Sequence, residues 1–336
     1  MLKIGIIGMG RMGKIHLNNL THKIENVEVV AVVTRGKEGQ QFALSKGIVD
    51  VSDSIDIILN NNEIDAVIIC SPNSTHADYA LQIAKSGKAI FCEKPIDMSL
   101  EKANRVINQI SEFGVPIMIG FNQRFDYNFS KVKEQVSNGA VGEIRSLRIT
   151  SRDPQPPPIS YIKESGGLFR DMTIHDFDLA RFIMNSEVEE VFAYGVCLID
   201  ENIEKAGDID CATVVLKFKN KAVCTIENSR DTNYGYDQRM EVFGSKGMLN
   251  VNNPLKSDVV SVTNSGTSTD VNLDFFIDRY EKSYLEELSS FIDALKNKKP
   301  MAVNGSDGIQ AMIIAEAANS SLKENRPIKI NSIKLK

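Results

Sequence analysis

This sequence has few cysteines and histidines, no strong excess of either charge and no long apolar run. The net charge is −5, and no basic cluster is interleaved with aromatic residues, so a nucleic-acid-binding surface is not expected. No apolar run approaches the ~20 residues that a membrane span needs. The first residues resemble a strand rather than a signal peptide. We therefore predict a cytoplasmic protein that binds neither nucleic acid nor membrane.

The cysteines are odd in number, widely spaced and set mostly in apolar, strand-like runs. This pattern is typical of reduced, buried thiols rather than of disulfides. No pair of them has the spacing of zinc ligands, so no metal site is predicted. The cysteines are Cys70, Cys92, Cys197, Cys211 and Cys224.

The length of 336 residues indicates about two domains, and 42% hydrophobic residues provide ample material for their cores. In residues 1–122, short apolar runs alternate with amphipathic stretches, which is typical of a parallel sheet with helices on both faces. We predict an α/β fold here, a doubly wound Rossmann domain that binds a dinucleotide. Its strands are predicted at Ile4–Ile7, Val27–Val33, Ala66–Cys70, Ala89–Cys92 and Ile117–Phe121, and its helices include Ala77–Ser86 and Leu100–Phe113.

Residues 123–336 have a different pattern, in which β-rich runs are separated by turns with little helix between them. This predicts an α+β domain with a large, mainly antiparallel sheet. A helical stretch is expected from Gly166 to about Met184. The clearest predicted strands are Glu143–Thr150, Cys211–Phe218, Ala222–Asn228 and Arg239–Phe243, and the last helices are near Tyr280–Lys296 and Asp307–Glu324.

The motif Gly8-x-Gly10-x-x-Gly13 joins the first strand to a helical pattern. Gly8 permits a tight turn, Gly10 lets the backbone approach a pyrophosphate, and Gly13 lets the helix pack against the strand. Glycines also close ordinary strand–helix turns, but the strand before and the helix after support nucleotide binding. The whole turn is a predicted cofactor contact, including the intervening Met9, Arg11 and Met12.

The second strand ends at Val33 and is followed by Thr34-Arg35, the position at which a dinucleotide fold selects its cofactor. An acidic side chain there would bind the ribose 2′-hydroxyl of NAD and repel the 2′-phosphate of NADP. Thr34 can donate a hydrogen bond, and Arg35 can offer a planar cation to a phosphate. The sequence therefore favours NADP or dual use, unless Arg35 is only a solvated surface residue.

Two further strands end in polar residues at the edge where the cofactor is expected. The first is followed by Ser71-Pro72-Asn73-Ser74-Thr75-His76, which either lines the cofactor site, caps the next helix or does both. The second is followed by Glu93-Lys94-Pro95. Lys94 at this position could stabilise an alkoxide as hydride leaves the substrate. An isolated Lys-Pro pair would otherwise be read as a surface lysine before a turn.

Asp171 and His175 are four residues apart, which would place them on one face of a helix. Histidine is suited to accept the hydroxyl proton when an alcohol is oxidised at neutral pH. A carboxylate beside it can orient the imidazole. The alternatives are a surface pair on a helix or a metal site, and no second histidine lies nearby in sequence to support a metal.

With these motifs in order along nearly the whole chain, the sequence resembles the Gfo/Idh/MocA oxidoreductase family, and within it the inositol 2-dehydrogenases most. The similarity further rests on residues 120–126, 151–158 and 234–244, and on Asp178 after His175. The aspartate that the NAD-using inositol enzymes carry at the end of the second strand is replaced here by Thr34-Arg35. This departure leaves the choice of cofactor open.

The resemblance implies a catalytic set of Lys94, Asp171 and His175, in which His175 takes the hydroxyl proton. It also implies cofactor contacts from Ser71, Pro72, Asn73, His76, Glu93, Lys94 and Asn122. Weaker candidates for a polyol pocket, or else for packing and loop capping, are Asp153, Asn233, Tyr234 and Tyr236.

The expected activity is oxidation of a cyclic polyol, myo-inositol or a stereoisomer, to a keto-inositol with NAD or NADP. An aldose dehydrogenase, an NAD-dependent glycosidase on the same fold and a non-catalytic dinucleotide sensor remain alternatives. The resemblance also implies a role in inositol catabolism and a homotetramer, assembled through the sheet of the second domain.

Overall fold

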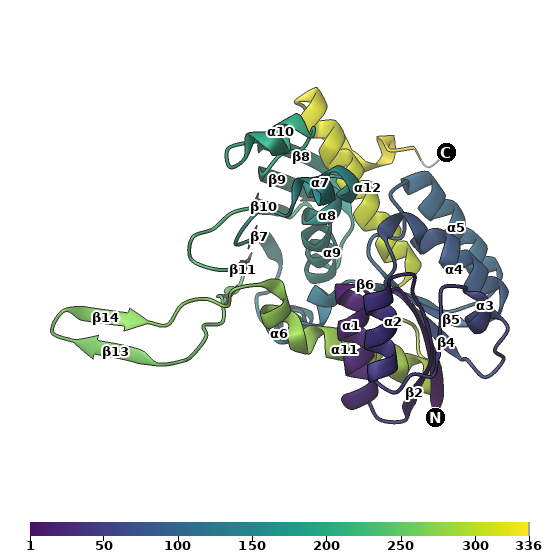
Figure 1. Ribbon diagram of the computed structural model, residues 1–336. Coiled ribbons are helices and arrows are strands. Elements are labelled where there is room, and N and C mark those ends of the chain that lie inside the picture. The colour runs from purple at the N-terminus through teal and green to yellow at the C-terminus, as the bar shows by residue number, and fades with distance from the viewer. Residues whose placement is uncertain (335–336) are drawn as a thin grey trace. The chain divides into compact units, whose positions relative to one another are not determined.

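The computed structural model describes residues 1–334, which form two compact units (Figure 1). The first unit contains Met1–Phe125 and Lys282–Gln310. The second contains Asp126–Glu281 and residues 311–334. This division differs from the predicted domains 1–122 and 123–336, because residues 282–310 pack with the first unit. The sequence pattern marks those residues as helical but does not reveal which core they join.

The first unit is built on a parallel sheet with strand order β3-β2-β1-β4-β5-β6. The order reverses between β1 and β4, and the carboxyl ends of strands at such a point are where doubly wound sheets bind ligands. This confirms the predicted Rossmann fold. The strands are β1 (Leu2–Ile7), β2 (Val27–Val33), β3 (Asp50–Ser52), β4 (Ala66–Ile69), β5 (Ala89–Glu93) and β6 (Ile117–Gly120).

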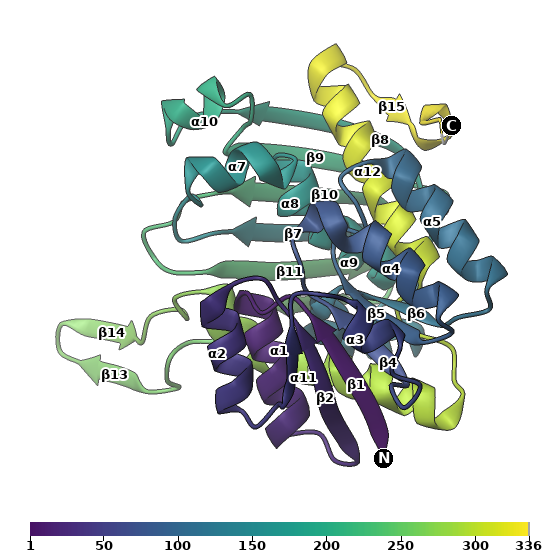
Figure 2. The same cartoon turned by 45° about the vertical axis from the view of Figure 1, so that its right-hand side comes forward.

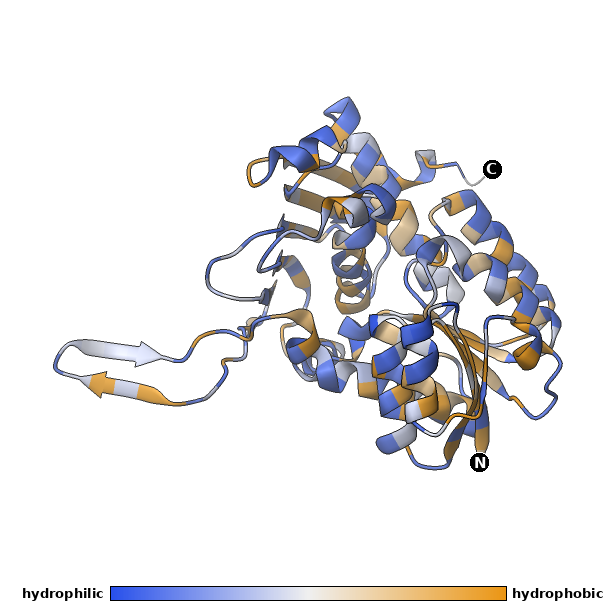
Figure 3. Cartoon of the chain, viewed as in Figure 1, coloured by the Kyte–Doolittle hydropathy of each residue, from blue (hydrophilic) through white to orange (hydrophobic). Residues whose placement is uncertain are grey.

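Helices cover both faces of this sheet. Helices α1, α2 and α11 lie on one side, and α3, α4 and α5 lie on the other (Figure 1). The central strands are fully buried between them and stand out as apolar segments in Figure 3. The helices are α1 (Arg11–His22), α2 (Lys37–Ser45), α3 (Asp56–Leu59), α4 (His76–Lys85) and α5 (Leu100–Glu112), with α11 (Phe276–Asn297) and α12 (Gly305–Glu324) each shared with the second unit.

The sequence accounts for the local structure of α5. Ser99 caps its first turn, its side-chain oxygen accepting a hydrogen bond from the Lys102 amide at 3.2 Å. Ala103, Val106 and Ile110 follow at helical spacing and are buried against the sheet. Short 3₁₀ turns at Asn73–Thr75 and Asn122–Phe125 follow β4 and β6.

The second unit contains a mixed sheet with strand order β12-β11-β7-β10-β9-β8-β15. All neighbours are antiparallel except β7 and β10, which are parallel. The predicted α+β architecture is therefore confirmed. The strands are β7 (Ile144–Arg152), β8 (Val188–Val196), β9 (Cys211–Phe218), β10 (Val223–Ser229), β11 (Asp237–Gly244), β12 (Met248–Val251) and β15 (Ile328–Lys329).

One face of this sheet packs against a nearly completely buried helix, α9 (Thr173–Met184). On β10, Ile226 and Asn228 are buried toward that helix, whereas Glu227 between them points to the opposite face. A separate exposed hairpin, β13 (Val260–Thr263) and β14 (Gly266–Thr269), extends from this unit (Figure 2). The remaining helices are α6 (Tyr127–Ser137), α7 (Ile159–Ser165), α8 (Leu168–Asp171), α10 (Glu201–Lys205) and a 3₁₀ turn at Ile330–Ser332.

Every helix within residues 1–334 is too short or too polar to span a bilayer.

Candidate active site

The glycine-rich turn between β1 and α1 has the shape that a dinucleotide site requires. Gly8 has a φ of +94°, and a Cβ atom there would lie 2.5 Å from the backbone of Cys70. A Cβ atom on Gly13 would lie 2.0 Å from the carbonyl oxygen of Gly8. Gly8 and Gly13 are therefore required by the packing of the turn itself.

Gly10 differs, because a Cβ atom at this position would meet nothing within 4 Å. It precedes the first residue of α1, and no side chain caps that helix end. Open space before uncapped amide groups is suited to a diphosphate. The turn residues thus fit a dinucleotide, and a glycine at position 10 is explained by an approaching ligand rather than by the protein's own packing.

Thr34 and Arg35 follow β2, as predicted. Thr34 is buried, its amide donates to the Ser52 carbonyl at 2.8 Å, and its own carbonyl accepts from Gln40 Nε2 at 3.1 Å. Arg35 is exposed. The side chain of Thr34 is packed beside Gly39 of α2, which leaves Arg35 as the charged group at this strand end.

The segment after β4 is held by its own hydrogen bonds. Thr75 Oγ1 donates to Ser71 Oγ at 2.7 Å. His76 is buried, and its Nε2 and Nδ1 lie 2.7 and 2.8 Å from the carbonyl oxygens of Ser71 and Pro95. Burial lowers the pKa of His76, against the effect of these carbonyls. His76 therefore links the loops that follow β4 and β5, and its contact with the cofactor stays a prediction.

Lys94 lies immediately after β5 and is half-buried. The preceding Glu93 is buried, with its Oε1 2.6 Å from Nε2 of His16. Asn122, in the turn after β6, is also buried. These predicted residues therefore occupy the carboxyl ends of neighbouring strands, because Glu93 pairs with Gly120 in the register of β5 and β6.

In the second unit, Asp171 and His175 lie on two successive helices, so the predicted single continuous helix is wrong here. Asp171 ends α8 and His175 belongs to α9, with the helix interrupted at Met172. Before α8, Gly167 has a φ of +85° and turns the chain into this short helix.

The surroundings of Asp171 give it a defined orientation. Its Oδ1 accepts a hydrogen bond from the Tyr161 hydroxyl at 2.8 Å. Its Oδ2 lies 3.3 Å from both terminal nitrogens of Arg230. Arg230 is almost completely buried and lies 3.9 Å from Asp208. Sequence reasoning missed Tyr161 and Arg230, because only the folded chain brings them to Asp171.

The residue after His175, Asp176, belongs to a buried network of polar side chains. Asp176 is fully buried and accepts a hydrogen bond from Asn228 Nδ2 at 2.8 Å, while Asn228 Oδ1 accepts one from Thr173 at 2.8 Å. Burial, helped by the charge of Asp153, raises the pKa of Asp176 to about 7 although the bond from Asn228 opposes it. The signal in the sequence was Asp176 itself, a carboxylate among the mostly apolar residues of α9. A carboxylate buried at such a position requires a hydrogen-bond partner.

The residues predicted to line a polyol pocket do not share one environment in the structure. The Tyr234 hydroxyl donates to Asp237 at 2.8 Å and accepts from Arg152. Tyr236 is buried against Phe275 and Tyr280, which agrees with a packing role.

A cavity of about 550 Å³ lies on the sheet of this unit and includes Asn233, Tyr234 and Glu227 in its lining. Asp171 and His175 are not among its lining residues. Since Glu227 points away from α9, the cavity opens on the sheet face opposite that helix. Asn233 and Tyr234 therefore line a cavity separate from Asp171 and His175. Asp153 lies beside Ser229, to whose carbonyl its amide donates at 2.9 Å.

Comparison with known proteins agrees with this geometry. Residues 2–121 match an oxidoreductase family with an NAD-binding Rossmann fold, and residues 129–250 match the GFO/IDH/MocA C-terminal domain. The chain is 45% identical to a myo-inositol 2-dehydrogenase of Thermotoga maritima, with 99% of each chain covered. It is 41% identical to an inositol 2-dehydrogenase of Rhizobium meliloti, covering 98% of this chain and 99% of that one.

A solved structure of scyllo-inositol dehydrogenase from Lactobacillus casei, with bound NAD(H) and scyllo-inositol, has a TM-score of 0.92 at 28% identity. The match covers 98% of this chain and 99% of the other. The protein belongs to the GFO/IDH/MocA family of NAD-binding oxidoreductases. The predicted family and enzyme class are therefore confirmed.

Proposed function

We propose that this protein is an inositol 2-dehydrogenase, which oxidises a secondary alcohol of myo-inositol or a stereoisomer to the keto-inositol. The observation that carries the proposal is the near-complete coverage at 41–45% identity by two relatives that bear this name. The open position at Gly10 supports it, because the turn leaves room for the cofactor that such a reaction consumes.

We propose Lys94, Asp171 and His175 as the catalytic set. Bound NAD would supply the hydride acceptor, held by the turn of residues 8–13, the end of β2 and the loops after β4, β5 and β6. The alcohol proton passes to His175 as the C–H bond breaks and the carbonyl forms. Nδ1 of His175 is buried while the residue is only half-buried, so Nε2 is the nitrogen that takes the proton.

Each of the other two members has a separate task in this proposal. Asp171, fixed by Tyr161 and Arg230, orients His175 and favours its charged form after proton transfer. Lys94 contacts the substrate oxygen and the cofactor, where its cation stabilises the developing negative charge. Asp153, Asn233, Tyr234 and Tyr236 remain candidates for polyol recognition. Asn233 and Tyr234 are exposed, but they line the cavity that is separate from Asp171 and His175.

NADP is proposed as a second cofactor beside NAD. The support is the exposed guanidinium of Arg35 at the end of β2, with Thr34 where an acidic side chain would exclude a 2′-phosphate. We further propose that the protein is cytoplasmic and that it forms a homotetramer. Analytical ultracentrifugation of the purified protein would test the oligomeric state.

The decisive experiment is a spectrophotometric screen of inositols and aldoses with NAD and NADP. We expect reduced nicotinamide to accumulate with at least one inositol and to require the polyol. Faster turnover of aldoses would replace the proposal with a sugar dehydrogenase, and sugar release without net reduction would indicate a glycosidase.

Variants then test the catalytic set. His175→Ala and Asp171→Asn should each bind NAD normally but lower kcat, by roughly a hundredfold or more for His175→Ala. Lys94→Ala should lower kcat and also weaken NAD binding, because Lys94 is proposed to contact the cofactor. Lys85→Ala provides a matched control, since Lys85 ends α4 away from the strand ends. Near-normal rates in His175→Ala would refute its role as the proton acceptor.

A further inference from the structure

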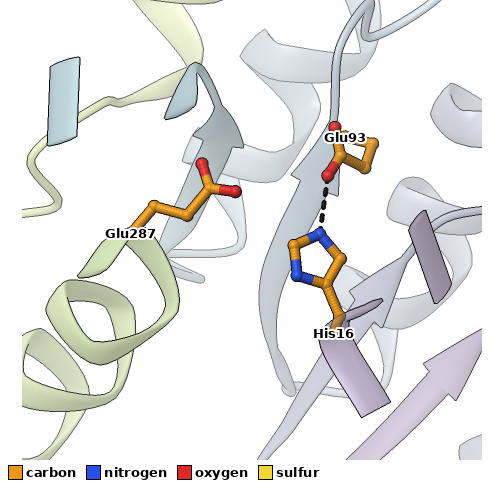
Figure 4. A group of neighbouring side chains, drawn as sticks. All are labelled: His16, Glu93 and Glu287. Atoms are coloured by element: carbon orange, nitrogen blue, oxygen red, sulfur yellow. Dashed lines mark hydrogen bonds and ion pairs between the residues drawn. The ribbon is translucent and has the colours of Figure 1, made fainter. Parts of the chain in front are cut away.

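The first unit contains a cluster of three polar side chains in an apolar interior. His16 on α1, Glu93 at the end of β5 and Glu287 on α11 point toward one another (Figure 4). Their exposed fractions are 0%, 9% and 0%, and one nitrogen or oxygen of each lies within 4.8 Å of the others. These residues are called the buried triad below.

The buried triad has too few hydrogen bonds to stabilise both of its carboxylates in their ionised forms. His16 and Glu93 are joined at 2.6 Å through Nε2 and Oε1. Neither oxygen of Glu287 has a hydrogen-bond partner among the described residues. A buried, ionised carboxylate with no such partner is strongly disfavoured. Burial, with the charge of Glu93 adding to it, raises the pKa of Glu287 well above its usual value.

Aromatic rings and thiols lie beside the buried triad. The rings of Phe91 and Tyr284 meet the His16 imidazole edge to face, with centroids 5.4 and 6.1 Å away. The thiols of the half-buried Cys70 and the buried Cys92 lie nearby, and desolvation together with the charge of Glu93 raises the pKa of each. These neighbours are rings and thiols, which favour the neutral form of Glu287.

Three donor groups at this spacing could also surround a metal ion. Zinc sites in proteins take four ligands, and magnesium and calcium take six or more oxygens. The buried triad offers three groups, two of which are already hydrogen-bonded to each other, inside an apolar wall. A proton on Glu287 removes the charge of its carboxylate and needs none of the further ligands that a metal ion requires.

We propose that Glu287 is a neutral carboxylic acid beside the hydrogen-bonded pair of His16 and Glu93, and that this triad positions the strand end that carries Lys94. Glu93 is the link, because it immediately precedes Lys94. A Cβ atom on Gly120 would lie 3.1 Å from Glu93 Oε2, so the carboxylate is held between β6 and His16. Fixing this side chain fixes the backbone from which Lys94 extends.

Glu287 is a positioning residue in this inference, which rests on the proposed function only for the role of Lys94. The protonation of Glu287 is tested on the full-length protein by infrared spectroscopy. We expect the carbonyl band of a protonated carboxyl group in the wild type at about pH 8, well above the usual glutamate range, and its loss in Glu287→Gln. An unchanged spectrum in Glu287→Gln would overturn the neutral carboxylic acid.

Metal content provides the second measurement. The wild type and Glu287→Gln are incubated with zinc or manganese, dialysed and analysed for bound metal. The proposal expects no stoichiometric metal in either protein. Metal bound at one equivalent in the wild type and lost in Glu287→Gln would replace the neutral carboxylic acid with a metal site.

Kinetics test the connection to Lys94. Glu287→Gln keeps a neutral side chain that can hydrogen-bond and should retain kcat within about twofold, whereas Glu287→Leu should lower kcat roughly tenfold or more without changing NAD affinity. In a Lys94→Ala background, Glu287→Leu should have no further effect on kcat. Additive losses would show that Glu287 acts independently of Lys94 and would overturn the positioning role.

Glu286→Leu is the matched control, because Glu286 is the exposed neighbour of Glu287 on the same helix. It should leave kcat and the infrared band unchanged. If no polyol is turned over by the wild type, the proposed function fails, yet the infrared and metal measurements still decide the protonation of Glu287.

Discussion

Gly8 and Gly13 lie so close together that a side chain on Gly13 would clash with the carbonyl oxygen of Gly8. A Cβ atom on Gly13 would lie 2.0 Å from that oxygen. Gly10, between them, faces open space. The packing of the turn thus requires Gly8 and Gly13, whereas Gly10 is proposed to be required for cofactor binding.

This difference predicts opposite outcomes for two alanine variants. Gly10→Ala should fold with an unchanged unfolding temperature but bind NAD roughly tenfold to a hundredfold more weakly, because a methyl group intrudes on the diphosphate and its backbone hydrogen bonds. Gly13→Ala should lower the unfolding temperature strongly. Calorimetric titration with NAD and thermal unfolding monitored by circular dichroism provide both measurements. Normal NAD affinity in Gly10→Ala would contradict the assignment of this turn.

Arg35 is predicted to support the use of NADP. Arg35→Ala should lower kcat/KM for NADP by roughly tenfold, the effect of losing one charge-assisted hydrogen bond, while leaving the value for NAD nearly unchanged. The measurement is steady-state kinetics with both cofactors. Lys37→Ala, an exposed cation two residues further along, serves as the control. A wild type that uses only NAD would show that Arg35 is a surface residue.

Asp176 should make the stability of the protein depend on pH. Its pKa is about 7 in the folded chain, against an ordinary value of 3.8. The folded state therefore holds the proton more tightly than the unfolded state. Stability is greatest below about pH 4 for this group and falls as the pH rises toward 7, by on the order of a few kcal/mol.

Asp176→Asn should remove this dependence, because the amide stays neutral and can still accept the hydrogen bond from Asn228. Relative to the variant, the wild type should lose stability between about pH 4 and pH 7 and show no further change above it. Thermal unfolding across this range is the measurement, with the exposed Glu164→Gln as the control. Parallel pH profiles for the wild type and Asp176→Asn would disprove the raised pKa.

Asp126 and Arg279 form a buried ion pair in the second unit, at exposed fractions of 3% and 9%. Asp126 also caps α6 by accepting from the amides of Asn128 and Phe129, each at 3.1 Å. Asp126→Ala should therefore destabilise this unit by about 3–5 kcal/mol, since it leaves a buried guanidinium without its partner. Chemical denaturation monitored by fluorescence would measure this.

The double variant Asp126→Ala/Arg279→Met distinguishes the two contributions of Asp126. It should recover part of the stability lost in the single variant, because the unpaired charge is gone while the lost cap remains. No recovery would show that the cap, rather than the ion pair, dominates.

Much of the fold could be predicted from the sequence, because most strands are continuous apolar runs or alternate regularly. Cys211–Phe218 was predicted with the bounds that β9 has. The short strand Asp50–Ser52 could not be predicted, since three largely polar residues have no period to detect. The helix expected from Gly166 to Met184 was wrong at Met172, where the chain leaves one short helix before the next begins.

Site residues could be predicted where they belong to a local sequence motif. They could not be predicted where folding brings together residues that are distant in the sequence. Glu286 and Glu287 look alike in the sequence, yet one is exposed and the other fully buried. The signal for Glu287 is its position on the apolar face formed by Tyr284, Leu288 and Phe291, at helical spacing. His16 and Arg230 are buried for reasons that only the packed structure reveals.

Residues 282–310 return to the first unit after the chain has built most of the second. Within that return, the Ile119 amide donates to the Val303 carbonyl at 3.0 Å, and Gly308 packs directly on Ile96 and Ile119. A fragment truncated after Phe125 would expose the outer edge of β6 and remove Glu287 from its cluster. Chimeras that exchange cofactor specificity between relatives must therefore transplant two separate stretches of chain, and the nucleotide-binding half is not complete during synthesis until residue 310 has emerged.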